Sequence, residues 1–299
     1  MSHLLSTPSN LRVLRPFAAT LLAALFIAAC ATGSPVLSVG DTDLDRAAIL
    51  EWVEARSGIA AVGEVTIDAQ VTADVLSELV TYEALVDLLA EHGVVASDAD
   101  LAAARDRLLG AGFEEASPTM GRLPRWQAAF DAIDAGVAGA RSAFEENAHL
   151  VGHELCTSHI LVSTESDAAD VIILLDAGGD FAELALQLSQ DPGSGSQGGD
   201  LGCVPTGAFV PTFERATLGA IAAGLSLVGP VPSQFGYHVI RIDQVLPTDA
   251  VPFDDLGAGA VNTLLTIATM TREVSLDGRF GTWDPVMGLV SPPSAPAED

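Results

Sequence analysis

The stretch from Cys156 to Asp243 limits the fold of this chain more than any other part of the sequence. It contains two short apolar runs that each begin at a histidine, His159-Ile-Leu-Val and His238-Val-Ile-Arg. Between them lie a loop rich in glycine and serine, the turn Gly199-Asp-Leu-Gly202 and a helical stretch that carries a phenylalanine. Short strand-like runs that alternate with helical stretches predict an α+β unit, in which a small sheet is covered by helices.

The elements expected in this unit follow from local patterns. A helix is expected from Ser166 to the glycine pair at 178–179, and Asp180 with Glu183 is typical of a capping box that starts a second helix. A third helix is expected at 211–224. The expected strands are 159–163, 200–204, 228–232 and 236–242.

The order of these landmarks resembles the parvulin-type, PpiC-like peptidyl-prolyl cis-trans isomerases. The resemblance covers residues 156–243 of the 299-residue chain. It implies a small, mostly antiparallel sheet covered by helices, and a rotamase activity at X-Pro bonds. It also implies that no metal, nucleotide or other cofactor is needed and that no covalent intermediate forms.

The resemblance places His159, Asp191 and His238 at the active site. The histidines are implied to form a mutually hydrogen-bonded pair under the pocket floor, which sets tautomer and geometry. The carboxylate of Asp191 is implied to face the prolyl amide, where it disfavours negative charge on the carbonyl oxygen and so weakens the C–N double bond. From the residues alone, a histidine on an apolar strand face is more often a core residue, and Asp191-Pro is equally typical of a turn without chemistry.

The same resemblance assigns a substrate-binding role to five further residues. Leu201, Phe209 and Phe213 occupy the positions of the apolar wall that receives the proline ring, and Ser233 and Phe235 fall at the pocket edge. Phe209 stands where methionine is common. The alternative from spacing alone is that these aromatic side chains are core residues.

The charge of the chain excludes several functions. Thirteen basic residues stand against forty acidic ones, for a formal net charge of −27, and the sequence contains no lysine. So acidic a surface is repelled by nucleic acid, and nucleic-acid binding is not expected. The absence of lysine excludes a Walker-type phosphate loop and Schiff-base chemistry.

The N-terminus has the pattern of an export signal. Arg12 and Arg15 precede an apolar run from Phe17 to Ala29 that is shorter than the ~20 residues a spanning helix needs. The context Ile27-Ala-Ala-Cys30 resembles the lipobox of bacterial lipoproteins, so Cys30 is the expected lipidation site of an extracytoplasmic, membrane-anchored protein of the bacterial envelope. Ordinary secretion and an uncleaved anchor are the alternatives.

Cys156 and Cys203 are the other two cysteines. An oxidising compartment and an even number of remaining cysteines favour a disulfide. If the strands that the two cysteines flank are neighbours, as in parvulins, their sulfurs can meet. Two buried free thiols are the alternative.

The rest of the chain reads as mainly helical. A strand is expected at 36–39, and helices are expected up to residue 56 and at 72–91, 98–109, 120–148 and 253–271. In foldases of the SurA and PrsA kind, an N-terminal helical region joins the segment after the isomerase to form a chaperone domain. The resemblance implies a helical chaperone-like region at 30–150, an isomerase domain at 151–246 and a segment at 247–290 that packs on the N-terminal region. The export pattern adds a signal peptide at 1–29, and the Pro-, Ser- and Ala-rich composition predicts a disordered tail at 291–299.

Other sequence patterns are weaker evidence for a function. Gly193-Ser-Gly-Ser-Gln-Gly198 matches a dinucleotide fingerprint in letters, but it follows a helix and precedes a strand, the reverse of what that motif requires. His149 and His153 have helical spacing without a third metal ligand, so no metal site is expected. The expected function is a foldase acting on X-Pro bonds of unfolded exported proteins, and the alternative is a peptide-binding chaperone with a catalytically weak parvulin module. No feature points to an oligomeric state.

Overall fold

The computed structural model describes residues 34–57 and 68–293, which divide between two compact units. The first contains the chain up to Ala135, together with Glu273–Trp283 and the residues from Val290 onward. The second contains Gly136–Arg272 and Asp284–Leu289.

The first unit joins an N-terminal and a C-terminal part of the chain through one small sheet. Strand β1 (Leu37–Val39) pairs antiparallel with β2 (Thr42–Leu44) on one side and β7 (Val274–Leu276) on the other. Because β7 follows β3–β6 in sequence, the stretch of chain that contains β3–β6 is inserted between two paired strands of this sheet in the order of the sequence. The helices of this unit are α1 (Arg46–Ser57), α2 (Ala69–Glu91), α3 (Asp98–Gly110) and α4 (Leu123–Asp134), with the 3-10 turn η1 (Pro118–Gly121) before α4.

The helical core of this unit is built around α2, which buries twelve of its residues. Among them is Glu83, which is fully buried. Its carboxylate accepts hydrogen bonds from Arg122 at 2.8 Å and from the indole N–H of Trp126 at 3.1 Å. A buried charge is tolerated where it is paired in this way, so this ion pair ties α2 to α4.

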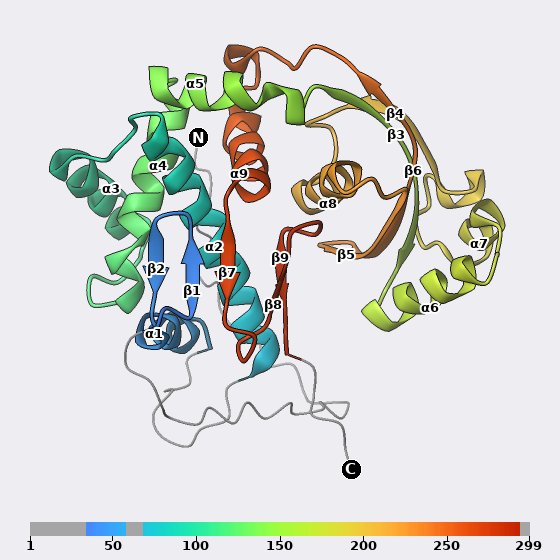
Figure 1. The fold of residues 1–299 in the computed structure, drawn as a ribbon, viewed down its shortest axis with the longest axis horizontal. Coiled ribbons are helices and arrows are strands. Elements are labelled where there is room, and N and C mark those ends of the chain that lie inside the picture. The colour runs from blue at the N-terminus through green and yellow to red at the C-terminus, as the bar shows by residue number, and fades with distance from the viewer. Residues whose placement is uncertain (1–33, 58–67, 294–299) are drawn as a thin grey trace. The chain divides into compact units, whose positions relative to one another are not determined.

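The second unit is organised around a four-stranded antiparallel sheet with the order β4-β3-β6-β5 (Figure 1). The strands are β3 (His153–Val162), β4 (Asp200–Pro205), β5 (Leu227–Ser233) and β6 (Gly236–Pro247). The helices are α5 (Ala138–Asn147), α6 (Glu165–Asp176), α7 (Phe181–Leu188), α8 (Pro211–Ala222) and α9 (Ala260–Thr271). Short 3-10 turns lie at Ala148–Leu150, Gly195–Gln197, Phe253–Asp255 and Gly257–Gly259. Strands β8 (Thr282–Asp284) and β9 (Leu289–Ser291) pair with each other; most of their residues belong to the first unit, and Asp284 and Leu289 belong to the second.

Helices cover both faces of this sheet. On one face, α6 and α7 pack against Ile160, Val162 and Val239 to form a hydrophobic core cluster. On the other face, α8 packs against Val228, Val231 and Ile240. Alternate residues of a strand point to opposite faces, so His159 and Leu161 share the α8 face. The expected α+β class and the antiparallel sheet covered by helices are confirmed.

Several element boundaries differ from the expected ones. The helix expected at 120–148 is two helices, α4 and α5, because Gly136 between them has a φ of +61° that a helix cannot contain. Strands β3 and β6 extend beyond 159–163 and 236–242, since each pairs along its length with the other. The helix expected from 253 begins at Ala260, after Gly257 at φ +52°.

The compact units also differ from the expected division of the chain. Helix α5, which precedes residue 151, and helix α9, which follows residue 246, both belong to the unit of the four-stranded sheet. The physical reason is that α9 packs on α5 and α8. The domain boundaries predicted from the sequence remain predictions. The expected signal peptide and Cys30 lie outside the described residues, as does the end of the expected tail, whereas Ser291 ends β9.

Within residues 34–57 and 68–293, no helix is both long and apolar enough to cross a membrane. The same part of the chain holds no cluster of three or more side chains suited to a metal ion.

Candidate functional site

His159 and His238 come together on the face of the sheet that α8 covers. In the antiparallel register His159 lies opposite Ile240, and His238 lies opposite Leu161, which makes the histidines diagonal neighbours. Their Nδ1 atoms are 2.9 Å apart and both side chains are buried. The structure therefore places the two rings in the hydrogen-bonded pair that the parvulin resemblance implies.

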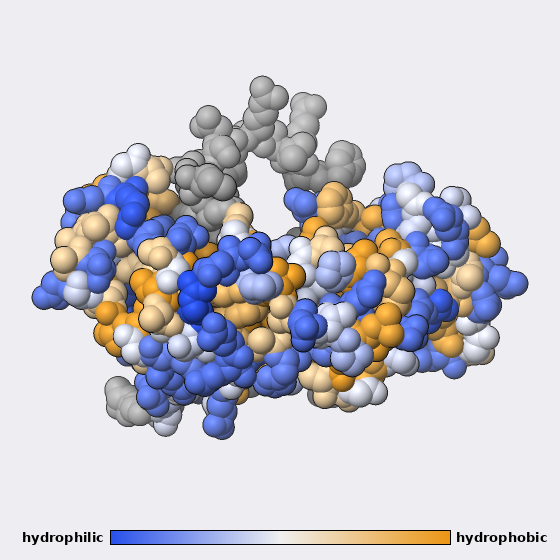
Figure 2. Space-filling view, turned by 90° about the horizontal axis from the view of Figure 1, so that it is seen from above, coloured by the Kyte–Doolittle hydropathy of each residue, from blue (hydrophilic) through white to orange (hydrophobic). Residues whose placement is uncertain are grey.

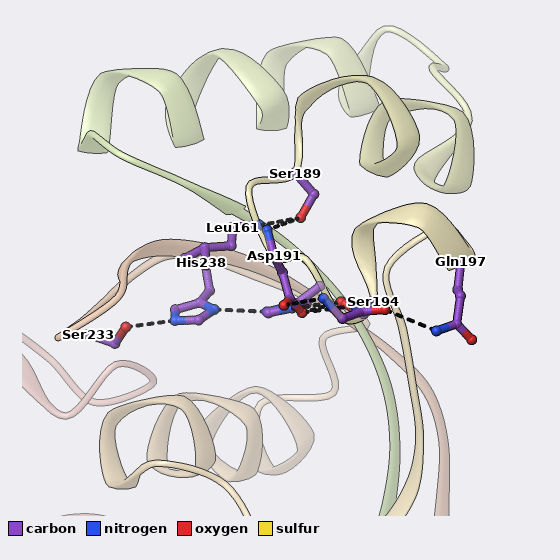
Figure 3. A network of polar contacts seen from close by, with 9 residues as sticks. Leu161, Ser189, Asp191, Ser194, Gln197, Ser233 and His238 are labelled. Carbon is purple, nitrogen blue, oxygen red and sulfur yellow. Dashed lines mark hydrogen bonds and ion pairs between the residues drawn. The ribbon is translucent and has the colours of Figure 1, made fainter.

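Asp191 meets His159 from the loop that follows α7. Its Oδ2 atom lies 2.8 Å from His159 Nε2 and accepts a 2.5 Å hydrogen bond from the hydroxyl of Ser194 (Figure 3). Its other oxygen accepts from the backbone N–H of Gly193 at 2.9 Å. Asp191 thus forms the Asx turn that was one alternative for it, and the same carboxylate contacts the histidine pair.

One assignment of protons gives every nitrogen of the two rings a partner, and it leaves only the longer 3.3 Å contact of the Ser233 hydroxyl with the Gly236 oxygen without a proton. The hydroxyl of Ser233 donates to His238 Nε2 at 2.7 Å, and His238 Nδ1 then donates to His159 Nδ1. His159 Nε2 is left to donate toward Asp191, with Ser194 Oγ also within 3.0 Å. In this arrangement a single direction of donation runs from Ser233 to Asp191, along the contacts drawn in Figure 3.

Two groups of this network have shifted pKa values, Asp191 and His238. The hydrogen bond from the Ser194 hydroxyl, helped by those from His159 and two backbone N–H groups, holds the pKa of Asp191 well below its ordinary value. Burial, with a smaller contribution from His159, lowers the pKa of His238 to about 4. At neutral pH the network therefore combines an ionised carboxylate with a neutral imidazole at His238.

An apolar wall lies next to the histidine pair. The ring of Phe213, on α8, meets His238 edge-on with centroids 5.4 Å apart, and lies 5.9 Å from the ring of His159. Phe209 packs on Phe213 at 4.5 Å, and Leu201 packs against the same core cluster. Phe213 is only 2% exposed, so it belongs to the core as well as to the wall.

Ser233 and Phe235 have different positions. The Ser233 hydroxyl belongs to the histidine network, and it also accepts a 3.0 Å hydrogen bond from the backbone N–H of Phe235. The Phe235 side chain is 61% exposed, which leaves it free to contact a bound peptide. Ser233 therefore contacts His238 rather than the apolar wall.

Two side chains at the site, Ser194 and Glu214, were not predicted from the sequence. Ser194 is 4% exposed and bonds both Asp191 and His159. Its position three residues after an aspartate was a local signal, because an Asx-type carboxylate accepts from the residue three positions on. Glu214, buried on α8, accepts a hydrogen bond from the N–H of Gly207 and so holds the loop that carries Phe209.

Gly199 explains how the Gly199-Asp-Leu-Gly202 turn approaches the site. Its φ is +84°, and a Cβ atom there would lie 2.4 Å from the backbone oxygen of His159. The His159 N–H donates to the Gly199 oxygen at 2.8 Å. Glycine is therefore required where this turn crosses the strand that carries the histidine.

Cys156 and Cys203 are opposite each other in the β3–β4 register, and the structure bonds their sulfurs. Cys156 is buried, whereas Cys203 is exposed.

Comparison with known proteins agrees with this geometry. Residues 149–245 match the profile of the PPIC-type PPIase domain. This segment is therefore a parvulin-type, PpiC-like domain, and the resemblance found in the sequence is confirmed.

The particular proteins to which the chain is similar are foldases. It is 46% identical over 85 residues to the foldase protein PrsA of Geobacillus kaustophilus, which is 28% of this chain and 30% of that protein. It is also 46% identical over 89 residues to the foldase protein PrsA 2 of Bacillus cereus, 30% of each chain. A crystal structure of the peptidylprolyl isomerase PrsA of Bacillus anthracis is 25% identical, covering 70% of this chain and 92% of that one with a TM-score of 0.33. The chain thus spans less than a third of the length of these two curated relatives.

Proposed function

We propose that this chain is a peptidyl-prolyl cis-trans isomerase, a foldase that acts on X-Pro bonds of unfolded exported proteins. The observation that carries the proposal is the continuous hydrogen-bond network from Ser233 through His238 and His159 to Asp191, beside the Phe213 ring. A directional polar network at the edge of an apolar wall suits a substrate whose two ends differ, a proline ring and its polar amide.

The chemistry follows from the barrier of the amide bond. Rotation about it costs ~18–20 kcal/mol because the planar form has partial double-bond character. The twisted form has less charge on its oxygen, so an ionised carboxylate near that oxygen disfavours the planar form more than the twisted one. Catalysis needs only that the site bind the twisted amide more tightly than either planar isomer.

Each part of the site has a role in this proposal. Phe213, Phe209 and Leu201 take the proline ring, and Phe235 contacts the chain at the rim. Asp191 acts on the amide, while His159 and His238 fix its position and keep their own protons. No proton, electron or group is transferred, so the proposed reaction needs no cofactor.

We also place the chain outside the cytoplasm, attached to a membrane by a lipid on Cys30. The support is the Ile27-Ala-Ala-Cys30 sequence after an apolar run, and the foldase names of the relatives. Mass spectrometry of the native protein is expected to find a lipid-modified Cys30 as the first residue. An unmodified N-terminus that begins elsewhere contradicts the anchor.

The proposed location suits a Cys156–Cys203 disulfide in the native protein, which would tie β3 to β4. A cross-link between residues 47 positions apart is worth roughly 4 kcal/mol in the chain-entropy model. Reduction should therefore lower the melting temperature. Two thiols that react with an alkylating reagent in the oxidised native protein contradict the bridge.

A peptide-binding chaperone with weak isomerase activity is the second candidate. It is favoured by large apolar side chains that α6 and α7 leave exposed, among them Ile173 at 63% and Leu186 at 59%. Hydrophobic patches also lie between the hydrophilic residues on the face drawn in Figure 2. Exposed apolar groups of this kind can bind unfolded chains without any chemistry.

A prolyl-peptide isomerisation assay on the full chain separates the two. The isomerase proposal expects that catalytic amounts of chain accelerate an exchange that otherwise takes tens to hundreds of seconds. Suppression of the aggregation of an unfolded protein is measured in parallel. A folded chain that suppresses aggregation but leaves the exchange rate unchanged supports the chaperone candidate instead.

A further inference from the structure

The far side of helix α8 holds a buried arginine that the isomerase chemistry does not use. Arg215 is 6% exposed and lies two residues after Phe213, which on a helix places the two side chains on roughly opposite faces. Phe213 faces the sheet and the histidine pair, and Arg215 points away from them. The helix that carries the apolar wall is therefore in contact with the rest of this unit on both sides.

Arg215 is surrounded by acceptors from outside the matched domain. Its Nε donates to the hydroxyl of Thr269 at 2.8 Å, and its terminal nitrogens donate to the backbone oxygens of Thr269, Pro285 and Val286 at 3.2, 2.8 and 3.1 Å. Thr269 lies on α9, and the other two residues lie in the turn between β8 and β9. All of them belong to the same compact unit as α8.

The turn at residues 284–289 is shaped to approach α8 closely. The Asp284 carboxylate accepts from the N–H groups of Val286 and Met287, which closes the turn. At Gly219 on α8, a Cβ atom would lie 2.1 Å from the Val286 oxygen, so the absence of a side chain permits this contact. Val286 and Met287 then pack against the core cluster that contains Phe213.

Burial of the Arg215 guanidinium costs free energy, and the hydrogen bonds that it makes are directional. Burial lowers the pKa of Arg215 to about 10, with the Asp284 carboxylate acting against the shift. Its hydrogen-bond partners are a hydroxyl and three carbonyls rather than a carboxylate, so an apolar side chain would fill the space at lower cost. What the planar guanidinium adds is a fixed geometry, because its N–H groups donate in set directions.

We propose that Arg215 is a positioning residue of the isomerase site, through which Thr269 and the turn at 284–289, outside the PPIC-type domain, set the position of the Phe213 wall and thereby the affinity for the prolyl peptide. This inference rests on the proposed isomerase function. It makes the substrate affinity of the domain depend on segments that follow it in the chain.

The test measures kcat and KM of the full chain in the prolyl-peptide assay for Arg215→Met and Thr269→Val. Valine keeps the shape of Thr269 and removes the acceptor of Arg215 Nε, together with the bonds of the hydroxyl to the backbone oxygens of Leu265 and Thr266 in the same helix. Both variants should raise KM about three- to tenfold, the range of coupling between contacting residues, with kcat within about twofold of wild type. The double variant should raise KM less than the product of the single effects.

Thr271→Val is the matched control. It lies on the same helix, and its hydroxyl bonds only backbone oxygens of Ile267 and Ala268 in that helix. Its KM should equal that of wild type. If Arg215→Met does not fold, Thr269→Val decides alone.

An unchanged KM in Thr269→Val, with or without a lower melting temperature, overturns the inference and makes the arginine purely structural. A folded wild-type chain without isomerase activity is a different result, because it contradicts the proposed function itself.

Discussion

The two faces of the four-stranded sheet use the same strands in different ways. Toward α6 and α7, the side chains of Ile160, Phe181 and Val239 belong to one hydrophobic core cluster. The polar side chains on this face, Ser158, Arg241 and Asp243, bond one another, and Arg241 lies over the Phe181 ring. Toward α8, the same strands present His159 and His238 beside Phe213. Burying two imidazoles costs free energy unless each ring nitrogen has a partner, so the second face is stable only because Ser233, Asp191 and Ser194 complete the network.

The difference predicts that residues on the α6 and α7 face contribute to stability but not to activity. Residues on the α8 face should contribute to both stability and activity. Substitutions that are matched in size but lie on opposite faces should therefore separate these quantities.

The largest effect is expected from the two buried phenylalanines. Phe181→Ala and Phe213→Ala should each lower the free energy of unfolding by about 3–5 kcal/mol, since each removes a buried ring. Only Phe213→Ala should raise KM in the isomerase assay. Should either chain fail to fold, the Phe→Leu pair, at about 1 kcal/mol each, carries the same comparison. Equal loss of substrate affinity on both faces would contradict the division.

A smaller loss is expected when the network is broken. His238→Ala leaves His159 Nδ1 buried without a partner, at about 1–3 kcal/mol, and should also reduce kcat. The control is His153→Ala, on the same strand β3 as His159, because its buried Nδ1 has no hydrogen-bond partner among the described residues. Urea denaturation at pH 7 measures the free energy of unfolding of both variants. A loss in His153→Ala as large as in His238→Ala would show that burial, rather than the network, sets the cost.

Removing one charge from the network should act mainly on turnover. Asp191→Asn keeps an oxygen for Ser194 and His159 but not the negative charge, so kcat should fall about tenfold, equivalent to ~1.4 kcal/mol, with little change in KM. Asp200→Asn, an exposed aspartate whose carboxylate accepts from Gly202 in the neighbouring turn, is the control and should retain wild-type kcat. An active Asp191→Asn would assign Asp191 to the Asx turn alone.

A further effect concerns acid stability. Because the pKa of His238 falls from 6.5 to about 4 on folding, the unfolded chain binds more protons between these values. Stability from this group is therefore full above about pH 6.5 and is lost as the pH falls toward 4; Asp191, whose pKa is also lowered, adds a further loss below 3.8. Urea midpoints from pH 7 to 4 should fall less steeply in His238→Asn than in wild type. Parallel profiles would mean that His238 carries no such linkage.

Much of the candidate site was predictable from the sequence because its signals are local. His159 and His238 stand in apolar runs, Gly199-Asp-Leu-Gly202 is a turn, and Phe213 stands in a helical stretch. Each pattern depends on residues a few positions apart. Ser194 was within reach of the same reasoning, through its spacing from Asp191, but nothing in the sequence shows that its hydroxyl also reaches the ring of His159.

The sequence alone therefore determined the kind of elements, their order and the side chains that the parvulin pattern requires. Only the tertiary structure decided which face of the sheet the histidines share, and that Arg215 meets acceptors 54 to 71 positions further along the chain. The reason is physical. Helix and strand preferences depend on hydrogen bonds and apolar periodicity over a few residues, whereas the partners of a buried charge depend on the register and packing of a whole unit. No local pattern marks Arg215, because its acceptors are mostly backbone carbonyls, which every residue has.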